Sequence, residues 1–189
     1  IPILFFICLN VEILCIYFFY WLNKKLYNKC KKIKLVLTDV DGVLTDGGMY
    51  YTDKGDIMKK FFTRDGMGVT LLRKNDIPTI IVTKEQTIMV KQWAKRMNVA
   101  ALYDGIVQKE SILDSICNDY KIDAQEIAYI GDDINDISLL KLVGLTAVPH
   151  DGISKVRSLS DYICKNNGGS GAFREFADLI LSAKSHNKA

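Results

Sequence analysis

The chain has 189 residues, of which 49% are apolar and 25% charged, and its formal net charge is +3. This length and composition suit one globular domain of ordinary size with a short appendage. The small net charge, without a basic face carrying interleaved aromatic residues, argues against nucleic-acid binding. The five cysteines are odd in number, widely spaced and form no C-x-x-C pair, which favours reduced thiols in a reducing compartment.

Residues 1–22 differ from the rest of the chain because they are almost wholly apolar. About 20 such residues span a bilayer as a helix. Glu12, near the middle, costs about 3 kcal/mol on insertion, whereas the Leu, Ile, Phe and Val residues together return about 4 to 8 kcal/mol. The lysines that follow would keep the remainder of the chain in the cytoplasm by the positive-inside rule. Two interpretations of residues 1–32 stay open: a membrane anchor with a lysine-rich linker, or a non-native extension, because Ile, Phe, Tyr, Asn and Lys are what AT-rich non-coding DNA encodes.

From residue 33 onward, short apolar runs alternate with helical patterns. The first run, Leu35–Thr38, is aliphatic or β-branched throughout, as in a strand covered on both faces. A hairpin follows, because residues 48–52 and 57–61 flank a glycine-containing turn. Later strands are expected at 77–83, 99–103, 127–130, 144–148 and 162–164, and helices at 63–74, 85–97, 108–120, after 136 as far as about 143, and from the glycine loop 168–171 onward. This alternation predicts an α/β domain with a parallel, doubly wound sheet over residues 33–185.

Two clusters of carboxylates follow two of the expected strands. Asp39 and Asp41 come directly after the first strand, and Asp132, Asp133 and Asp136 follow a later one. The carboxyl ends of parallel strands lie along one edge of a sheet, so the clusters can converge there. Several close carboxylates raise one another's pKa values, and a divalent cation removes this conflict. Oxygen ligands without a nearby His or Cys favour Mg²⁺.

A carboxylate nucleophile beside a metal indicates phosphate chemistry that proceeds through an aspartyl-phosphate. A phosphoryl group in transfer also needs hydroxyl and cationic partners. Thr83 ends the strand after the hairpin, and Lys109 opens the helix after the following strand. The competing interpretation of Asp39–Gly42 is a turn that uses Asp and Gly for conformational reasons alone.

These residues resemble the four motifs of haloacid dehalogenase superfamily phosphatases, here Asp39–Gly47, Thr83, Lys109 and Gly131–Asp136. More narrowly, residues 33–181 resemble the small cap-less branch that holds 3-deoxy-D-manno-octulosonate 8-phosphate phosphatases and phosphatases of nonulosonate (sialic-acid-type) 9-phosphates. Three further stretches fit this branch: Gly47–Tyr51, Phe62–Gly66 and Gly168–Glu175. The resemblance implies a Rossmann-like parallel sheet with a β-hairpin flap and no large cap domain, and a place in sialic-acid or lipopolysaccharide biosynthesis.

The resemblance also implies catalytic roles. Asp39 would be the nucleophile and a Mg²⁺ ligand, and Asp132 would be a further ligand. Asp41 would protonate the leaving alcohol and then activate water, and it would bind the metal through its backbone carbonyl. Asp133 and Asp136 would position metal-bound water or the loop.

Substrate contacts follow from the same resemblance. Thr83 and Lys109 would hold the phosphoryl oxygens. The residues expected to bind substrate are Phe62, Thr63, Arg64, Asp65, Gly66, Glu85 and Lys109. In this branch the hairpin and the C-terminal glycine loop complete a neighbouring subunit's site and the assembly is a tetramer, so the resemblance implies a homotetramer.

Two departures from the resemblance bear on the substrate. Lys84 stands where the second motif has glycine, which adds a side chain close to the phosphate site. Glu85 and Trp93 stand where octulosonate-type members carry arginines that suit a substrate carboxylate. Glu85, with Arg96 farther along the helix, looks more like the nonulosonate phosphatases, so a nonulosonate or acylneuraminate 9-phosphate is favoured as substrate and 3-deoxy-D-manno-octulosonate 8-phosphate comes next. The alternative function is a non-catalytic tetramerisation or regulatory module, of the kind appended to acylneuraminate cytidylyltransferases.

Overall fold

The computed structural model describes residues 24–185. The apolar segment 1–22, with its expected membrane anchor, lies outside the described residues. Among the helices of the described part, none is both long and apolar enough to cross a membrane.

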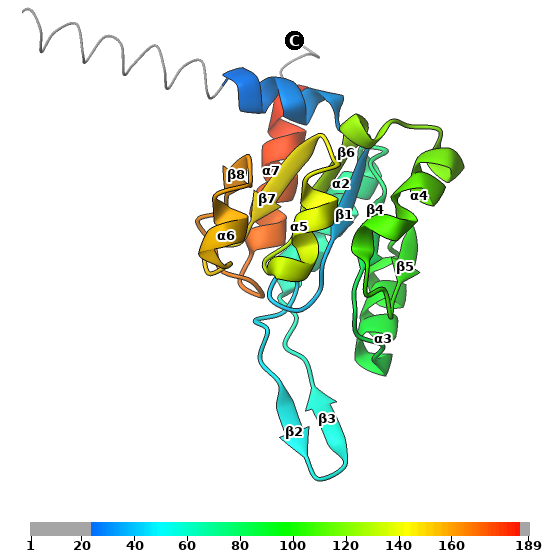
Figure 1. Ribbon diagram of the computed structural model, residues 1–189, viewed down its shortest axis with the longest axis vertical. Helices are drawn as coiled ribbons and strands as arrows, with labels where there is room; N and C mark the ends of the chain where they lie inside the picture. The colour runs from blue at the N-terminus through cyan, green and yellow to red at the C-terminus, as the bar shows by residue number, and fades with distance from the viewer. Residues whose placement is uncertain (1–23, 186–189) are drawn as a thin grey trace, which may run out of the picture.

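A six-stranded sheet forms the centre of the molecule, and its neighbouring strands are all parallel. The strands lie in the order β5–β4–β1–β6–β7–β8 (Figure 1). Their bounds are β1 (Leu35–Thr38), β4 (Thr79–Val82), β5 (Ala101–Tyr103), β6 (Ile127–Ile130), β7 (Leu145–Val148) and β8 (Tyr162–Ile163). The chain winds outward from β1 in one direction and then, from β6, in the other. The crevice between β1 and β6 is therefore the place where such a sheet binds ligands.

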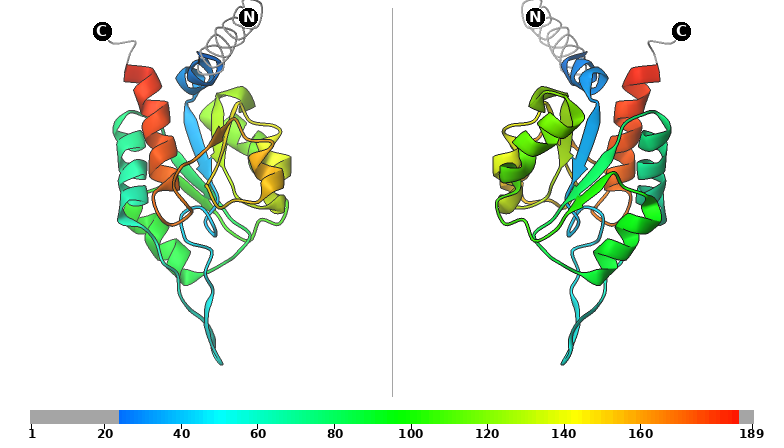
Figure 2. Two further views of the ribbon diagram at one scale, coloured as in Figure 1. Left: turned by 90° about the vertical axis from the view of Figure 1, so that its left-hand side faces the viewer. Right: turned by 90° about the vertical axis from the view of Figure 1, so that its right-hand side faces the viewer.

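Helices cover both faces of the sheet, which explains why its strands are continuous apolar runs (Figure 2). One face carries α2 (Thr63–Lys74), α3 (Ile88–Met97) and α7 (Ala172–Ser185), and the other carries α4 (Leu113–Tyr120), α5 (Ile137–Leu140) and α6 (Ser154–Arg157). Successive residues of β1 alternate between the two apolar cores: Val36 packs in the first, and Leu35 and Leu37 in the second. The predicted doubly wound α/β fold is confirmed.

The helix expected from residue 85 begins only at Ile88. Thr87 has an extended backbone, and its hydroxyl accepts the N–H of Val90 at 3.3 Å, which caps the helix there. Residues 84–87 consequently form a loop beyond the carboxyl end of β4. The helix expected from residue 108 also begins differently, with a 3-10 turn, η1 (Lys109–Ile112), ahead of α4. Two more such turns are η2 (Ala124–Glu126) and η3 (Ile134–Asp136).

The hairpin of β2 (Tyr50–Thr52) and β3 (Gly55–Met58) projects away from the sheet, at the end where β1 delivers its loop (Figure 1). Gly55 takes a φ of +108° at its turn, which favours glycine. The hairpin exposes several large apolar side chains, those of Met49, Tyr50, Tyr51, Ile57 and Met58. Within the described residues no large cap domain is present.

Candidate active site

The carboxyl ends of three central strands open into one polar cavity of about 160 Å³. Its lining residues are Asp39, Asp41, Thr83, Lys84, Glu85, Asp132, Asp133 and Asn135. The two carboxylate clusters therefore converge, although they lie about ninety residues apart in the chain. Asn135 was not anticipated, because a single amide in a short turn carries no motif of its own.

A tight loop after β1 presents Asp39 and Asp41. The N–H groups of Leu44 and Thr45 donate to the carbonyl of Val40 at 2.9 and 3.0 Å. Gly42 has a φ of +87°, and a Cβ at this position would lie 2.1 Å from Asp132 Oδ2. Glycine is thus required here both for the backbone conformation and for the approach of the second cluster.

Lys109 is a fully buried cation between two carboxylates. Its Nζ lies 2.8 Å from Asp39 Oδ1 and 2.6 Å from Asp136 Oδ1. Burial alone would lower the pKa of Lys109, but the charges of Asp39 and Asp136 outweigh burial and raise it. The lysine is therefore a permanent positive charge against one oxygen of Asp39.

Every oxygen of Asp136 is engaged. Oδ1 accepts hydrogen bonds from Lys109 and from the hydroxyl of Tyr129, and Oδ2 accepts the N–H groups of Asp132 and Asp133 at 2.8 and 3.1 Å. These are the contacts of a side chain that fixes the loop after β6. A Cβ at Gly131 would lie 2.5 Å from Asp136 Oδ2, which accounts for the glycine that precedes the cluster.

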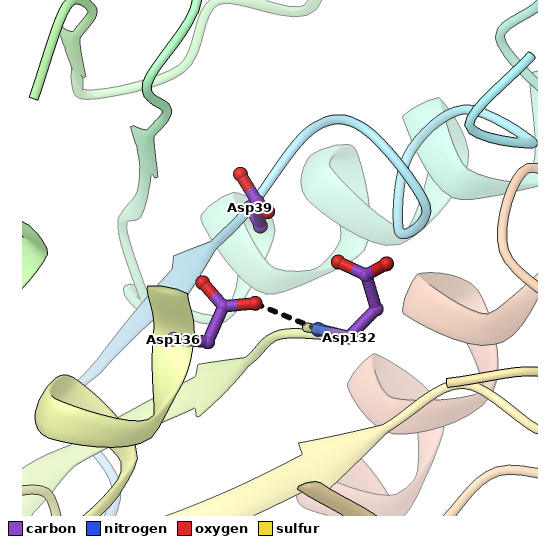
Figure 3. A group of neighbouring side chains, drawn as sticks. All are labelled: Asp39, Asp132 and Asp136. Carbon is purple, nitrogen blue, oxygen red and sulfur yellow. Dashed lines mark hydrogen bonds between the residues drawn. The ribbon is translucent and has the colours of Figure 1, made fainter. Parts of the chain in front are cut away.

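The carboxylates of Asp39, Asp132 and Asp136 each place one oxygen within 4.8 Å of the others (Figure 3). Burial and the charge of Asp136 raise the pKa of Asp39 to about 7. Burial and the charges of Asp39 and Asp136 raise the pKa of Asp132 to about 8. Asp132 Oδ1 is buried without a hydrogen-bond partner among the described residues. This donor set fits a hard divalent cation, and because Asp136 is saturated, Asp39 and Asp132 are the side chains that can hold it.

Asp41 is held by a residue that the sequence did not indicate. Its Oδ1 lies 2.6 Å from Lys59 Nζ and accepts the hydroxyl of Thr45 at 3.3 Å. Lys59 also lies 3.4 Å from Glu85 Oε2. Because the side chain of Asp41 is engaged in this way, its expected part in metal binding concerns the backbone carbonyl. A lysine at the end of a hairpin strand has no local signal that marks it as part of a site.

The segment 62–66 begins α2, and none of its residues lines the catalytic cavity. Thr63 and Arg64 are exposed, and Arg64 lies over the ring of Phe62 at 5.8 Å. Asp65, which was expected to contact substrate, is fully buried, and its Oδ1 accepts the N–H of Arg174 at 2.8 Å. Burial raises the pKa of Asp65 to about 6. Asp65 joins α2 to the first turn of α7.

Phe62, Thr63 and Gly66 line a separate hollow of about 170 Å³, which they share with Phe61, Trp93, Arg96 and Met97. The rings of Trp93 and Phe61 stack with centroids 4.9 Å apart. The indole of Trp93 therefore packs α3 against the base of the hairpin. Of the two departures at these positions, only Glu85 reaches the catalytic cavity.

The C-terminal glycine loop packs behind the loop after β1 of its own chain. The N–H of Gly169 donates to the carbonyl of Val43 at 2.9 Å, and a Cβ at Gly168 would lie 1.9 Å from the carbonyl oxygen of Gly42. The carboxylate of Glu175 accepts the N–H of Asn166 at 3.0 Å and holds the approach to the loop. The glycine loop thus packs directly against the loop that carries Asp39 and Asp41.

Comparison with known proteins agrees with this geometry. The haloacid dehalogenase-like hydrolase family matches residues 73–176. The curated 3-deoxy-D-manno-octulosonate 8-phosphate phosphatase of Haemophilus influenzae is 33% identical over 156 residues, covering 82% of this chain and 87% of that protein. The corresponding phosphatase of Escherichia coli is also 33% identical over 156 residues, covering 83% of that protein.

Solved structures give the same result. The cobalt-bound phosphatase of H. influenzae superposes with a TM-score of 0.81 at 32% identity, covering 83% of this chain and 92% of that one. The Moraxella catarrhalis 3-deoxy-D-manno-octulosonate 8-phosphate phosphatase, in complex with magnesium, phosphate and the sugar acid, gives a TM-score of 0.82 at 34% identity, covering 86% and 94%. The chain therefore belongs to the haloacid dehalogenase-like hydrolase family, and it is a phosphatase.

Proposed function

We propose that this chain is a Mg²⁺-dependent phosphomonoesterase that hydrolyses a sugar-acid phosphate through an aspartyl-phosphate on Asp39. The proposal rests on two neighbouring carboxylates at the cavity. Asp39 forms an ion pair with the buried Lys109, and Asp132 has a buried oxygen without a hydrogen-bond partner among the described residues. The relatives named above act on a sugar-acid phosphate, and the M. catarrhalis structure contains magnesium and phosphate.

In the proposed reaction, one oxygen of Asp39 stays with Lys109 while the other attacks phosphorus. The bond from phosphorus to the sugar oxygen breaks, and Asp41 gives a proton to that oxygen. Asp41 then takes a proton from water, which attacks phosphorus and releases Asp39. Bound through Asp39, Asp132 and the carbonyl of Asp41, Mg²⁺ would neutralise phosphoryl charge.

Thr83 is placed to bind the phosphoryl group. Its side chain is buried at the cavity, and its hydroxyl oxygen accepts the N–H of Glu85 at 3.4 Å. The hydroxyl proton therefore remains for a phosphoryl oxygen. Lys84 is the only cation among the residues that line the cavity, and a dianionic substrate is attracted to it.

Glu85 supports a nine-carbon nonulosonate or acylneuraminate 9-phosphate as the preferred substrate. It lines the catalytic cavity, where an acidic side chain accepts hydrogen bonds from hydroxyl or amide groups but repels a carboxylate. The second candidate is 3-deoxy-D-manno-octulosonate 8-phosphate, which the names of the relatives favour.

The test is phosphate release by the full chain from N-acetylneuraminate 9-phosphate and from 3-deoxy-D-manno-octulosonate 8-phosphate, with Mg²⁺ and with a chelator. We expect release from both substrates only with Mg²⁺, and a higher kcat/KM for the nine-carbon acid. A higher kcat/KM for the eight-carbon acid would keep the reaction and reverse the preference. No Mg²⁺-dependent release from either would favour the non-catalytic module.

The proposed assembly is a homotetramer, in line with the exposed apolar side chains of the hairpin. Light scattering of the full chain and of a variant in which Tyr51 and Ile57 are replaced by serine tests it, since the variant should dissociate.

The proposed location is the cytoplasm, with residues 1–22 as an anchor to the inner face of the membrane. Cell fractionation with and without residues 1–32 tests the anchor, and an equally soluble full chain would contradict it.

A further inference from the structure

Lys59 is a buried cation that bridges two carboxylates of the catalytic cavity. It follows β3 at the base of the hairpin, and its side chain is only 2% exposed. Its Nζ lies 2.6 Å from Asp41 Oδ1 and 3.4 Å from Glu85 Oε2. The two carboxylates come from the loops after β1 and β4, so a single hairpin residue joins both loops at the cavity.

The two oxygens of Asp41 have different surroundings. Oδ1 accepts from Lys59 and from the hydroxyl of Thr45, whereas Oδ2 is buried without a hydrogen-bond partner among the described residues. A group that exchanges a proton must present one oxygen in a fixed direction to the reacting atom. Because Oδ1 is held by two donors, the free oxygen of Asp41 is Oδ2.

We propose that Lys59 is a positioning residue for the acid/base carboxylate Asp41, an inference that rests on the proposed phosphatase reaction. In the first half-reaction an oxygen of Asp39 bonds to phosphorus, the bond from phosphorus to the sugar oxygen breaks, and a proton on Asp41 Oδ2 moves to that oxygen. In the second, Oδ2 takes a proton from water as the water oxygen bonds to phosphorus and the bond to Asp39 breaks. Throughout both steps Lys59 holds Oδ1, which keeps Oδ2 directed at the reacting oxygen.

The neighbouring lysine provides a matched control. Lys60 lies on the other side of the extended segment, because successive residues of such a segment point in opposite directions. Its side chain is 54% exposed, and its Nζ lies 3.4 Å from Asp46 Oδ2. Lys60→Met removes the same charge from the same stretch of chain without touching Asp41.

The experiment compares Lys59→Met and Lys60→Met in the full chain with Mg²⁺ and two substrates. One is the sugar-acid phosphate, whose alcohol leaves with a proton, and the other is p-nitrophenyl phosphate, whose nitrophenolate leaves without one. Rapid quenching measures leaving-group release in the first turnover. For Lys59→Met we expect alcohol release to fall about 10- to 100-fold and nitrophenolate release to stay within about threefold of wild type. Lys59→Arg, which keeps the cation, should recover most of the alcohol release, and Lys60→Met should match wild type.

An equal loss with both substrates would overturn the proposal, since it would show that Lys59 merely supports the cavity. No loss with either substrate would overturn it as well. Lys59→Gln keeps a hydrogen-bond donor without the charge, and it is measured in parallel in case Lys59→Met fails to fold. A wild-type chain that releases phosphate from neither substrate would instead contradict the proposed phosphatase function, and the positioning role with it.

Discussion

At the scale of single residues, the buried carboxylates Asp39 and Asp136 differ in what their oxygens are free to do. Both contact Lys109, but Asp136 also accepts from Tyr129 and from two backbone N–H groups. Both oxygens of Asp136 therefore already accept hydrogen bonds that hold its loop and the lysine. Asp39 keeps one oxygen away from the lysine, and this difference supports the proposal that Asp39 is the nucleophile and Asp136 a structural support.

Gly42→Ala should disable the site with a modest loss of stability. The new Cβ would meet Asp132 Oδ2 at 2.1 Å in a backbone of positive φ, so the loop and the carboxylate of Asp132 must move apart. We expect phosphate release to fall about 100-fold or more, and the free energy of unfolding to fall by about 1 to 3 kcal/mol. Steady-state kinetics and denaturant unfolding measure the two effects.

Gly55→Ala is the matched control for this prediction. Gly55 also has a positive φ, but a Cβ there would meet nothing within 4 Å. The control shares the backbone strain without the collision, so its activity should stay near that of wild type. A Gly42→Ala enzyme as active as Gly55→Ala would show that the loops need not approach this closely.

At the scale of helices, strands and loops, the sequence predicted the features that depend on residues close together in the chain. The strand Leu35–Thr38 and the carboxylates after it could be recognised, because apolar runs and motif spacing are local. Lys59 and Asp65 could not be placed, since the partner of Lys59 is 18 residues away and that of Asp65 is 109 residues away. The start of α3 was predicted three residues too early. The sequence allows the helix to begin at Glu85 or after a Thr87 cap, and only the folded loop shows that Thr87 is the N-cap.

The free energy of unfolding should fall as pH rises, because of Asp65 between α2 and α7. The pKa of Asp65 is raised to about 6 in the folded chain by burial, against an ordinary value of 3.8. The folded state therefore binds the proton more tightly than the unfolded state. The stabilisation is complete below pH 3.8 and is lost as pH rises through 6, by up to about 3 kcal/mol.

Asp65→Asn isolates this effect, because the amide oxygen still accepts the N–H of Arg174 and does not titrate. We expect the free energy of unfolding of the variant, relative to wild type, to increase between pH 4.5 and 7.5, as measured by urea unfolding at about six pH values. A difference that does not change with pH would mean that Asp65 has an ordinary pKa.

At the scale of the whole molecule, the doubly wound topology brings several buried carboxylates together at one edge of the sheet, although burial disfavours their charged forms. The crevice between β1 and β6 receives Asp39 from one strand and Asp132 from the other, and burial raises the pKa of both. Close, buried carboxylates destabilise the folded state when no cation is bound, and the same carboxylates form a site for a metal ion. Its stability should therefore depend strongly on a divalent cation.

Mg²⁺ should stabilise the folded chain, since it binds the folded state and relieves the repulsion. At a concentration 100 times the dissociation constant the gain is about 2.7 kcal/mol. Asp132→Asn removes one of the repelling charges and one ligand, so it should melt above wild type in a chelator and gain little from Mg²⁺. Thermal melting of both proteins, with Mg²⁺ and with chelator, measures this. Equal Mg²⁺ stabilisation of both would exclude Asp132 as a ligand.

The most direct test of the central claim, that Asp39 is the nucleophile, is to trap its phosphorylated side chain. The full chain is mixed with Mg²⁺ and a sugar-acid phosphate, quenched in acid within the first turnover, digested and mapped by mass spectrometry. We expect the phosphoryl group on Asp39 in the wild-type chain, and none in Asp39→Asn, which should fold normally and release no phosphate. A phosphoryl group on another residue, or undiminished phosphate release by Asp39→Asn, would contradict the claim.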